Sequence, residues 1–209
     1  MLKKWEDLPE FMRVDEVKPY WEALCRKKVQ LFLKKVFDLI AAFILFVLLL
    51  IPMLVIAIVI KLDSQGSVFY RQERVTAYGK KFRIHKFRTM VTNAERIGTA
   101  VTVGNDSRIT KAGSRLRKVR LDELPQIIDV LQGNMSFVGT RPEAIKYVEK
   151  YEPEWYATLL QPAGITSECS IHFKDEDKLL DNAYDVDKVY MERVLPEKMR
   201  WKLKSRPWL

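Results

Sequence analysis

An aspartate and a glutamate stand side by side in the chain, directly after a run of basic residues. Asp122 and Glu123 belong to the segment SRLRKVRLDELPQ, in which four cations precede them: Arg115, Arg117, Lys118 and Arg120. A carboxylate that attacks a phosphate needs a divalent ion or basic groups to neutralise the charge between the two anions. The segment offers both kinds of group. A similar cluster also forms ordinary surface salt bridges, which is the alternative interpretation.

A second segment presents an arginine at a defined backbone angle. Arg141 precedes Pro142 in the segment GNMSFVGTRPE, residues 133–143. Because proline forces the residue before it into an extended conformation, the Arg141 side chain projects in a fixed direction. A guanidinium held in this way suits bidentate binding of a phosphate, whereas a solvated arginine in the turn before a helix is the alternative.

The cysteines, the histidines and a later acidic run do not extend this chemistry. Cys25 and Cys169 lack the spacing of a zinc or redox motif, which indicates free thiols in a reducing compartment. His85 and His172 each lack a partner at metal-ligand spacing. The acidic run lacks the ordered alternation of a calcium loop and is interpreted as a solvated helix start: Asp175, Glu176, Asp177 and Asp181.

The basic residues are concentrated in one part of the chain. The protein has 209 residues and a formal net charge of +9. Residues 61–120 contain about fifteen Lys and Arg against about four acids, whereas residues 121–209 contain about twelve against about sixteen. This distribution predicts a polyanionic ligand for the central stretch: nucleic acid, anionic lipid headgroups or the pyrophosphate of a nucleotide.

One apolar segment is long enough to cross a membrane. Residues 36–60 form a run in which Asp38 is the only charged residue. The run begins too late and is too long for a cleaved signal peptide. Basic residues flank both of its ends, so the positive-inside rule draws both ends to the cytoplasm. Pro52 lies near the middle and predicts a kink.

These features predict a re-entrant helix rather than one straight spanning helix. The helix would break at Ile51 and Pro52 and leave the membrane on the face where it came in, which satisfies both basic flanks. Asp38 would then lie near the cytoplasmic interface, within reach of basic neighbours, instead of unpaired in hydrocarbon.

The rest of the sequence predicts a helix-dominated α+β fold. Short strands are expected over residues 67–71 and 81–87, joined by a turn at Tyr78 and Gly79. Pro125 suits the first turn of a helix, which would place Asp122 and Glu123 at that helix's N-terminus. The expected helices cover residues 90–96, 112–119, 121–130, 142–151 and 187–203.

Three segments together resemble a known family. They are KLDSQGSVFYRQERV, KFRIHKFRTM and RLRKVRLDELPQIIDVLQGNMSFVGTRPE, in this order along the chain. With the apolar run and its proline, they resemble the small monotopic phosphoglycosyl transferases, the bacterial sugar transferases that initiate polyprenyl-linked glycans. The resemblance covers roughly residues 34–165.

The resemblance implies a two-step displacement. In the family, the aspartate of the Asp-Glu pair attacks a UDP-sugar, releases UMP and holds the phosphosugar as an acyl phosphate, which polyprenyl phosphate then attacks. It implies that Asp122 is the nucleophile and Glu123 its partner, with Mg²⁺ bound at this pair. The residues implied to contact phosphate or nucleotide are Arg117, Arg141, Pro142, Lys86 and Arg88.

The resemblance also implies partners and a location. The expected partners are a UDP-sugar, polyprenyl phosphate and membrane lipids, without nucleic acid, at the cytoplasmic face of the bacterial inner membrane. The expected organisation is an N-terminal interfacial or packing arm over residues 1–30, the re-entrant helix over 31–61, and a cytosolic catalytic domain with a basic amphipathic tail over 62–209. The sugar, the glycan pathway and homodimer formation stay open.

Three positions depart from the family pattern. Ile51 stands where a serine commonly precedes the bending proline, so a hydroxyl that could cap the freed backbone is missing. Thr140 stands where the loop more often reads Gly-Pro-Arg-Pro. Beyond Gln161 the sequence follows the family only in part, and sugar choice is expected to depend on this region.

Two other function classes compete with the transferase hypothesis. The first is a membrane-tethered nucleic-acid-binding protein, which the basic stretch would suit, although no recognition helix or base-stacking motif is recognisable. The second is a non-enzymatic scaffold whose basic surface holds anionic lipid. Turnover of a sugar nucleotide that depends on Asp122 would exclude both.

Overall fold

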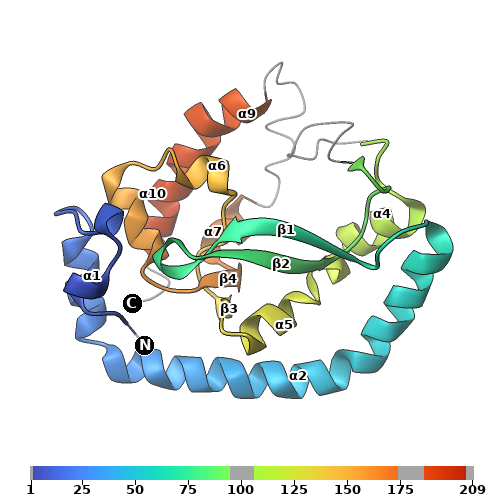
Figure 1. Cartoon of the computed structure of the whole chain (residues 1–209), viewed down its shortest axis with the longest axis horizontal. Helices are drawn as coiled ribbons and strands as arrows, with labels where there is room; N and C mark the ends of the chain where they lie inside the picture. The colour runs from blue at the N-terminus through green and yellow to red at the C-terminus, as the bar shows by residue number, and fades with distance from the viewer. Residues whose placement is uncertain (1, 95–105, 174–185, 206–209) are drawn as a thin grey trace.

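The computed structural model describes residues 2–94, 106–173 and 186–205 of the chain. Within these residues helices dominate, and the strands are few and short (Figure 1). The fold is therefore a helix-dominated α+β fold, as the sequence predicts.

A single long helix, α2, runs along one side of the molecule. It extends over Lys28–Asp63, 36 residues, and continues through Pro52. Figure 1 shows that α2 bends toward its C-terminal end and rises toward the α4 side of the body. The prediction that the helix breaks at Ile51 and Pro52 is therefore wrong, because the helix is continuous there. An internal proline removes one backbone hydrogen bond and can bend a helix without ending it.

Most of the apolar surface of α2 is exposed. Its most apolar stretch has a mean hydropathy of 3.4, yet only 11% of that stretch is buried. A helix of this composition in the core of a soluble protein would be buried nearly all round. Within the described parts of the chain, α2 is the one helix whose length and composition suffice to cross a membrane. An apolar surface of this extent needs a cover other than water.

A polar cluster fastens α2 to the body of the protein. Asp38 is buried, and its Oδ2 lies 2.8 Å from Nζ of Lys34 and 2.7 Å from Oγ of Ser136. Lys34 also donates to Ser136. Because the Asp38 carboxylate is paired and hydrogen-bonded, its burial on the apolar helix α2 is tolerated. Ser136 lies on strand β3, Met135–Val138, so this cluster fixes α2 against that strand.

The first sheet forms the floor of the site described below. Strand β1, Phe69–Val75, pairs antiparallel with β2, Lys81–Phe87, through the 3₁₀ turn η3, Ala77–Gly79. The prediction for β2 is confirmed, and β1 begins and ends later than expected. Gln72 of β1 lies opposite Ile84 of β2. Arg74, two residues after Gln72, and Lys86, two residues after Ile84, lie on the same face of the sheet as this pair.

A second sheet was not expected from the sequence. Strand β3 pairs in parallel with β4, Ala163–Thr166. The chain passes so closely here that a Cβ on Gly164 would lie 2.2 Å from the backbone nitrogen of Gly139. Glycine is therefore required where the two strands meet.

The helices around the Asp-Glu pair differ in part from the prediction. Helix α4, Lys111–Lys118, is confirmed. The predicted helix over 121–130 is wrong at its start: a 3₁₀ turn, η4 (Leu121–Glu123), comes first, and α5 (Gln126–Leu131) follows with Pro125 as its N-cap. Asp122 and Glu123 therefore lie on a separate turn before α5, not in its first turn.

The later helices are shorter or less regular than predicted. The helix expected over 142–151 is only α6, Ile145–Val148, since Ala144 before it is extended. The helix expected over 187–203 is confirmed as three successive pieces: α9 (Val186–Val189), the π-helical turn η6 (Tyr190–Val194) and α10 (Leu195–Ser205).

Some predictions fall wholly or partly on residues that are not described. Met90, at the start of the helix predicted over 90–96, instead pairs with Ile109 in an isolated antiparallel bridge. Residues 95 and 96, the acidic run after Lys174 and the end of the tail after Ser205 lie outside the described residues.

The N-terminal arm packs into the main core. It consists of η1 (Trp5–Asp7), η2 (Glu10–Met12) and α1 (Lys18–Cys25). Its fully buried side chains contact the core built from η5 (Pro153–Leu159) and α10. A short helix, α7 (Glu168–His172), packs against α10. The arm's buried residues are Leu8, Met12, Val17 and Leu24. Burial of this kind stabilises the C-terminal helices that border the site.

Candidate active site

A cleft of about 520 Å³ lies over the β1–β2 sheet and is rich in basic side chains. Its walls are the α4–η4 turn, the loop around Arg141, and the C-terminal helices η6 and α10. Eight cations face three carboxylates in its lining: Arg74, Lys86, Arg117, Lys118, Arg120, Arg141, Lys198 and Lys202, against Asp122, Glu123 and Glu143. A concave surface with this excess of positive charge concentrates anionic ligands.

A strained residue directs the Asp-Glu turn toward the cleft. Arg120 follows the end of α4 with φ 56° and ψ 23°, in the left-handed region. Its backbone N–H donates to the carbonyl of Arg117 at 3.1 Å, which reverses the chain just before Asp122. Glycine usually occupies such a position after a helix, and a side chain there costs about 1–2 kcal/mol. Strain of this kind is often retained at functional sites.

Glu123 is held by two cations. Nζ of Lys86 lies 2.9 Å from Oε1, and Nη1 of Arg141 lies 3.2 Å from Oε2, while Nη2 of Arg141 also donates to Oε1. Burial by itself would raise the pKa of Glu123, but the charges of Lys86 and Arg141 outweigh it and hold the pKa well below its usual range. Glu123 is therefore ionised, with both oxygens engaged.

Asp122 lies in a different electrostatic environment on the same turn. Burial and the neighbouring charge of Glu123 raise its pKa, although Lys86 and Arg117 oppose the change. No side chain among the described residues donates a hydrogen bond to the Asp122 carboxylate. The turn thus holds one carboxylate that is neutralised by cations and one that is available to react or to bind a ligand.

The other implied contact residues divide into two groups. Arg117 and Pro142 line the cleft with Lys86 and Arg141. Arg88 does not: its Nη2 donates to the carbonyl and hydroxyl of Ser64, at 2.7 and 2.9 Å, beyond the end of α2. Arg88 lies just beyond the end of β2 at Phe87, and its side chain is bound to Ser64 and not to the cleft.

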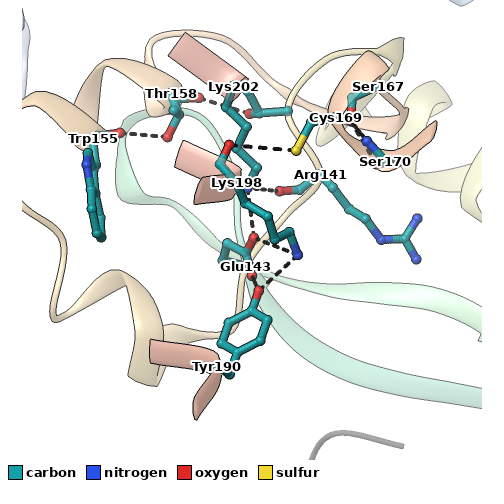
Figure 2. A network of polar contacts seen from close by, with 11 residues as sticks. Arg141, Glu143, Trp155, Thr158, Ser167, Cys169, Ser170, Tyr190, Lys198 and Lys202 are labelled. Carbon is teal, nitrogen blue, oxygen red and sulfur yellow. Dashed lines mark hydrogen bonds and ion pairs between the residues drawn. The ribbon is translucent and has the colours of Figure 1, made fainter. Parts of the chain in front are cut away.

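A buried polar cluster lies on the side of the cleft formed by η6 and α10. It was not predicted from the sequence. Oε1 of Glu143 lies 2.7 Å from Nζ of Lys202 and 3.8 Å from Nζ of Lys198, and its Oε2 accepts from the hydroxyl of Tyr190 at 3.0 Å. Figure 2 shows the two lysines converging on Glu143. A signal was present in the sequence: Lys198 and Lys202 recur four residues apart, each adjacent to an apolar residue of α10.

The carboxylates allow a test of the Mg²⁺ expectation. No group of three or more potential ligands occurs among the described residues. Mg²⁺ in phosphoryl-transfer sites is typically held by one or two carboxylates together with substrate phosphates. Asp122 fits this role, whereas Glu123 does not fit it while Lys86 and Arg141 occupy its oxygens. A metal in this cleft would therefore be held by Asp122 and by a bound phosphate.

The fold and the site together define a class of protein. A carboxylate in a cationic cleft, with no described side chain donating a hydrogen bond to it, is suited to nucleophilic attack on a phosphorus atom. The long apolar helix α2 has the length and composition to enter a membrane. The sequence of the whole chain identifies the family more closely. Residues 29–197 match the family described as bacterial sugar transferase, and the chain belongs to that family. It is accordingly a transferase.

Individual relatives share this region. A UDP-N-acetylgalactosamine-undecaprenyl-phosphate N-acetylgalactosaminephosphotransferase of Aeromonas hydrophila is 40% identical over 132 residues, which cover 63% of this chain and 31% of that protein. A UDP-glucose:undecaprenyl-phosphate glucose-1-phosphate transferase of Escherichia coli (strain K12) is 42% identical over 120 residues, 57% of this chain and 26% of that protein. The chain thus spans less than a third of the length of these two relatives.

Another relative is matched over most of its own length. An exopolysaccharide production protein PSS of Rhizobium leguminosarum bv. phaseoli is 38% identical over 145 residues, which cover 66% of this chain and 72% of that protein.

Proposed function

We propose that this protein transfers a sugar-1-phosphate from a UDP-sugar to polyprenyl phosphate, as the first membrane step in assembly of a bacterial glycoconjugate. The observation that carries the proposal is the difference between two adjacent carboxylates in the cationic cleft: Lys86 and Arg141 neutralise Glu123, whereas no described side chain donates a hydrogen bond to Asp122. The relatives support the choice of substrates, since two of them are named as transferases that use UDP-sugars and undecaprenyl phosphate.

In the first step, an oxygen of the Asp122 carboxylate attacks the phosphorus that bears the sugar. A new P–O bond forms to Asp122, and the P–O bond to the uridine monophosphate breaks, so UMP leaves with the bonding electrons. Lys86, Arg117 and Arg141 lie in the cleft where charge on the transferred phosphoryl group develops. Fixed cations in a partly buried site stabilise such a transition state.

In the second step, an oxygen of polyprenyl phosphate attacks the same phosphorus atom. The bond from phosphorus to Asp122 breaks, which returns the carboxylate and yields the polyprenyl-diphosphate-sugar. Each step exchanges one P–O bond for another and needs no net proton transfer. Mg²⁺, where bound by Asp122 and the donor phosphates, supplies further neutralisation of phosphate charge.

The proposal includes a re-entrant course for α2 at the cytoplasmic face of the inner membrane. Two contacts support it. Near the N-terminal end of α2, Asp38 binds Ser136 of the body, and at its C-terminal end Oδ2 of Asp63 accepts from the backbone N–H of Ala112 at 3.1 Å. A helix that crossed the membrane would carry its ends to opposite sides, yet both ends here contact one body. The exposed apolar surface between them faces lipid.

UMP release from purified protein tests the function. Protein in nanodiscs is mixed with polyprenyl phosphate, Mg²⁺ and each of a panel of UDP-sugars, and UMP is measured for wild type and Asp122→Asn. We expect UMP from wild type only, with one preferred donor. An absence of UMP from every donor, with the fold and the lipid carrier verified, would favour the lipid-binding scaffold instead.

A further inference from the structure

A contact between the C-terminal helix and the Arg141 loop has a consequence for the active site. Lys202 of α10 is 2% exposed, and its Nζ lies 2.7 Å from Oε1 of Glu143 and 3.4 Å from the backbone carbonyl oxygen of Arg141. One ammonium group therefore binds both sides of Pro142. Figure 2 shows the Arg141 carbonyl on the side of Lys202, while the Arg141 guanidinium points away from the cluster.

The rest of the loop is fixed on its other sides. The carbonyl of Glu143 accepts from the backbone N–H of Val75 on β1 at 3.1 Å, and the carbonyl of Thr140 accepts from the N–H of Gly164 at 2.8 Å. These bonds hold the residues before and after Arg141-Pro142. Lys202 donates to the backbone carbonyl of Arg141 itself. Pro142 restricts the backbone on both sides of this bond, so the loop cannot easily adjust if the bond is lost.

The position of the loop determines where the Arg141 guanidinium lies relative to the catalytic turn, η4, which contains Asp122 and Glu123. The guanidinium donates to both oxygens of Glu123, next to Asp122. A displacement of the loop would move the guanidinium relative to Glu123 and to a phosphate in the cleft. Misplacement of about 1 Å in a catalytic arrangement can cost a hundredfold in rate.

We propose that Lys202 is a positioning residue: through the Arg141 carbonyl and the Glu143 carboxylate it sets the Arg141 guanidinium against Glu123 and the phosphate of the donor. Its action on turnover rests on the proposed function, whereas its action on the loop does not. A residue about 60 positions away in sequence thus completes the catalytic turn, and the C-terminal helix is part of the active site.

Hydrogen exchange tests the positioning independently of substrate. Backbone exchange is measured in nanodiscs for wild type, Lys202→Met and Lys202→Arg, with Lys204→Met as the control because Lys204 is an exposed lysine on the same helix. We expect faster exchange for Lys202→Met at Val75 and across residues 139–148, with little change for Lys202→Arg and none for Lys204→Met. Unchanged exchange in this region for Lys202→Met would overturn the inference. So would faster exchange spread evenly over the whole fold.

A double-mutant cycle tests the effect on the reaction. Lys202→Met is compared in the wild-type and Arg141→Ala backgrounds by kcat/KM for UMP release. We expect a loss of about tenfold or more in the wild-type background and of less than twofold when Arg141 is already absent. Equal losses in both backgrounds would show that Lys202 acts only on general stability and would contradict the proposal. If wild type releases no UMP, the proposed function fails while hydrogen exchange still decides the positioning.

Discussion

The guanidinium of Arg141 binds both carboxylate oxygens of Glu123, with Nη1 3.2 Å from Oε2. Lys86 binds the same carboxylate from the β2 side. The charge of Glu123 is therefore used to hold two cations in the cleft, and Asp122 is left without such a partner. Two adjacent carboxylates acquire different roles because their surroundings differ, which is how acid and base functions are commonly separated in active sites.

Asp122→Asn is expected to remove activity while stabilising the fold. UMP release should fall by at least about a thousandfold, since this substitution removes the proposed nucleophile. Burial raises the Asp122 pKa in the folded protein, so its charge destabilises the fold at pH values above that pKa. The melting temperature at pH 7 should therefore rise for Asp122→Asn, and the difference should vanish below pH 3.8, where Asp is protonated in both states. A lower melting temperature at pH 7 would contradict this environment for Asp122.

The acid limb of the pH–rate profile should report Asp122. Because Asp122 must be ionised to act as the proposed nucleophile, kcat/KM should fall with decreasing pH around a pKa above the ordinary value of 3.8. Lys86 is the charge that most lowers this pKa, so Lys86→Met should move the limb to higher pH. Lys118→Met is the control, because Lys118 lines the cleft without such an effect on Asp122. A limb that moves to lower pH in Lys86→Met would exclude Asp122 as its source.

Local patterns made much of the catalytic turn predictable. The alternation of apolar and basic residues over 81–87 predicts β2, and the DE pair after four cations predicts a charged cluster beside α4. The pair was expected in the first turn of a helix, whereas it lies on the separate turn η4. The position of Arg88 could not be predicted from the same pattern. Lys86 and Arg88 are two residues apart and would share a face in a longer strand, but the strand ends between them.

Contacts between distant segments account for what the sequence did not indicate. Glu143 meets Lys202, and β3 meets β4, only after the chain has folded across long separations. A buried lysine such as Lys202 looks like a solvated one in sequence, because its burial depends on a carboxylate contributed by another segment. Gly139 and Gly164 are far apart in sequence, and nothing local indicates that their backbones come into contact. Their close approach follows from the pairing of β3 with β4.

The bond between Ser136 and Asp38 should be needed for α2 to remain fixed on the body. Ser136→Ala removes the hydroxyl that donates to the buried carboxylate and is expected to cost about 1–3 kcal/mol of unfolding free energy. Ser67→Ala is the matched control, since Ser67 is exposed and its hydroxyl accepts only one long bond from Phe69 N–H at 3.3 Å. Chemical denaturation in detergent measures both. Equal stability of the two variants would show that this cluster does not hold the helix.

Substitution by glycine should have opposite effects on the free energy of unfolding at Arg120, whose backbone is left-handed, and at Arg117, which is helical. Arg120→Gly should raise the unfolding free energy by up to about 1 kcal/mol, because glycine adopts this conformation without strain. Arg117→Gly, inside α4, should lower it by about 1 kcal/mol. Both variants lose one cation from the cleft, so the comparison separates backbone strain from charge. A destabilised Arg120→Gly would show that the turn is not strained.

The covalent role proposed for Asp122 can be tested directly. Wild-type protein is mixed with the preferred UDP-sugar in the absence of polyprenyl phosphate, quenched and measured by intact and peptide mass spectrometry. We expect a mass increase equal to one sugar-1-phosphate less one water, located on Asp122, that disappears when polyprenyl phosphate is added and never forms in Asp122→Asn. UMP release without any adduct, or an adduct on another residue, would contradict it.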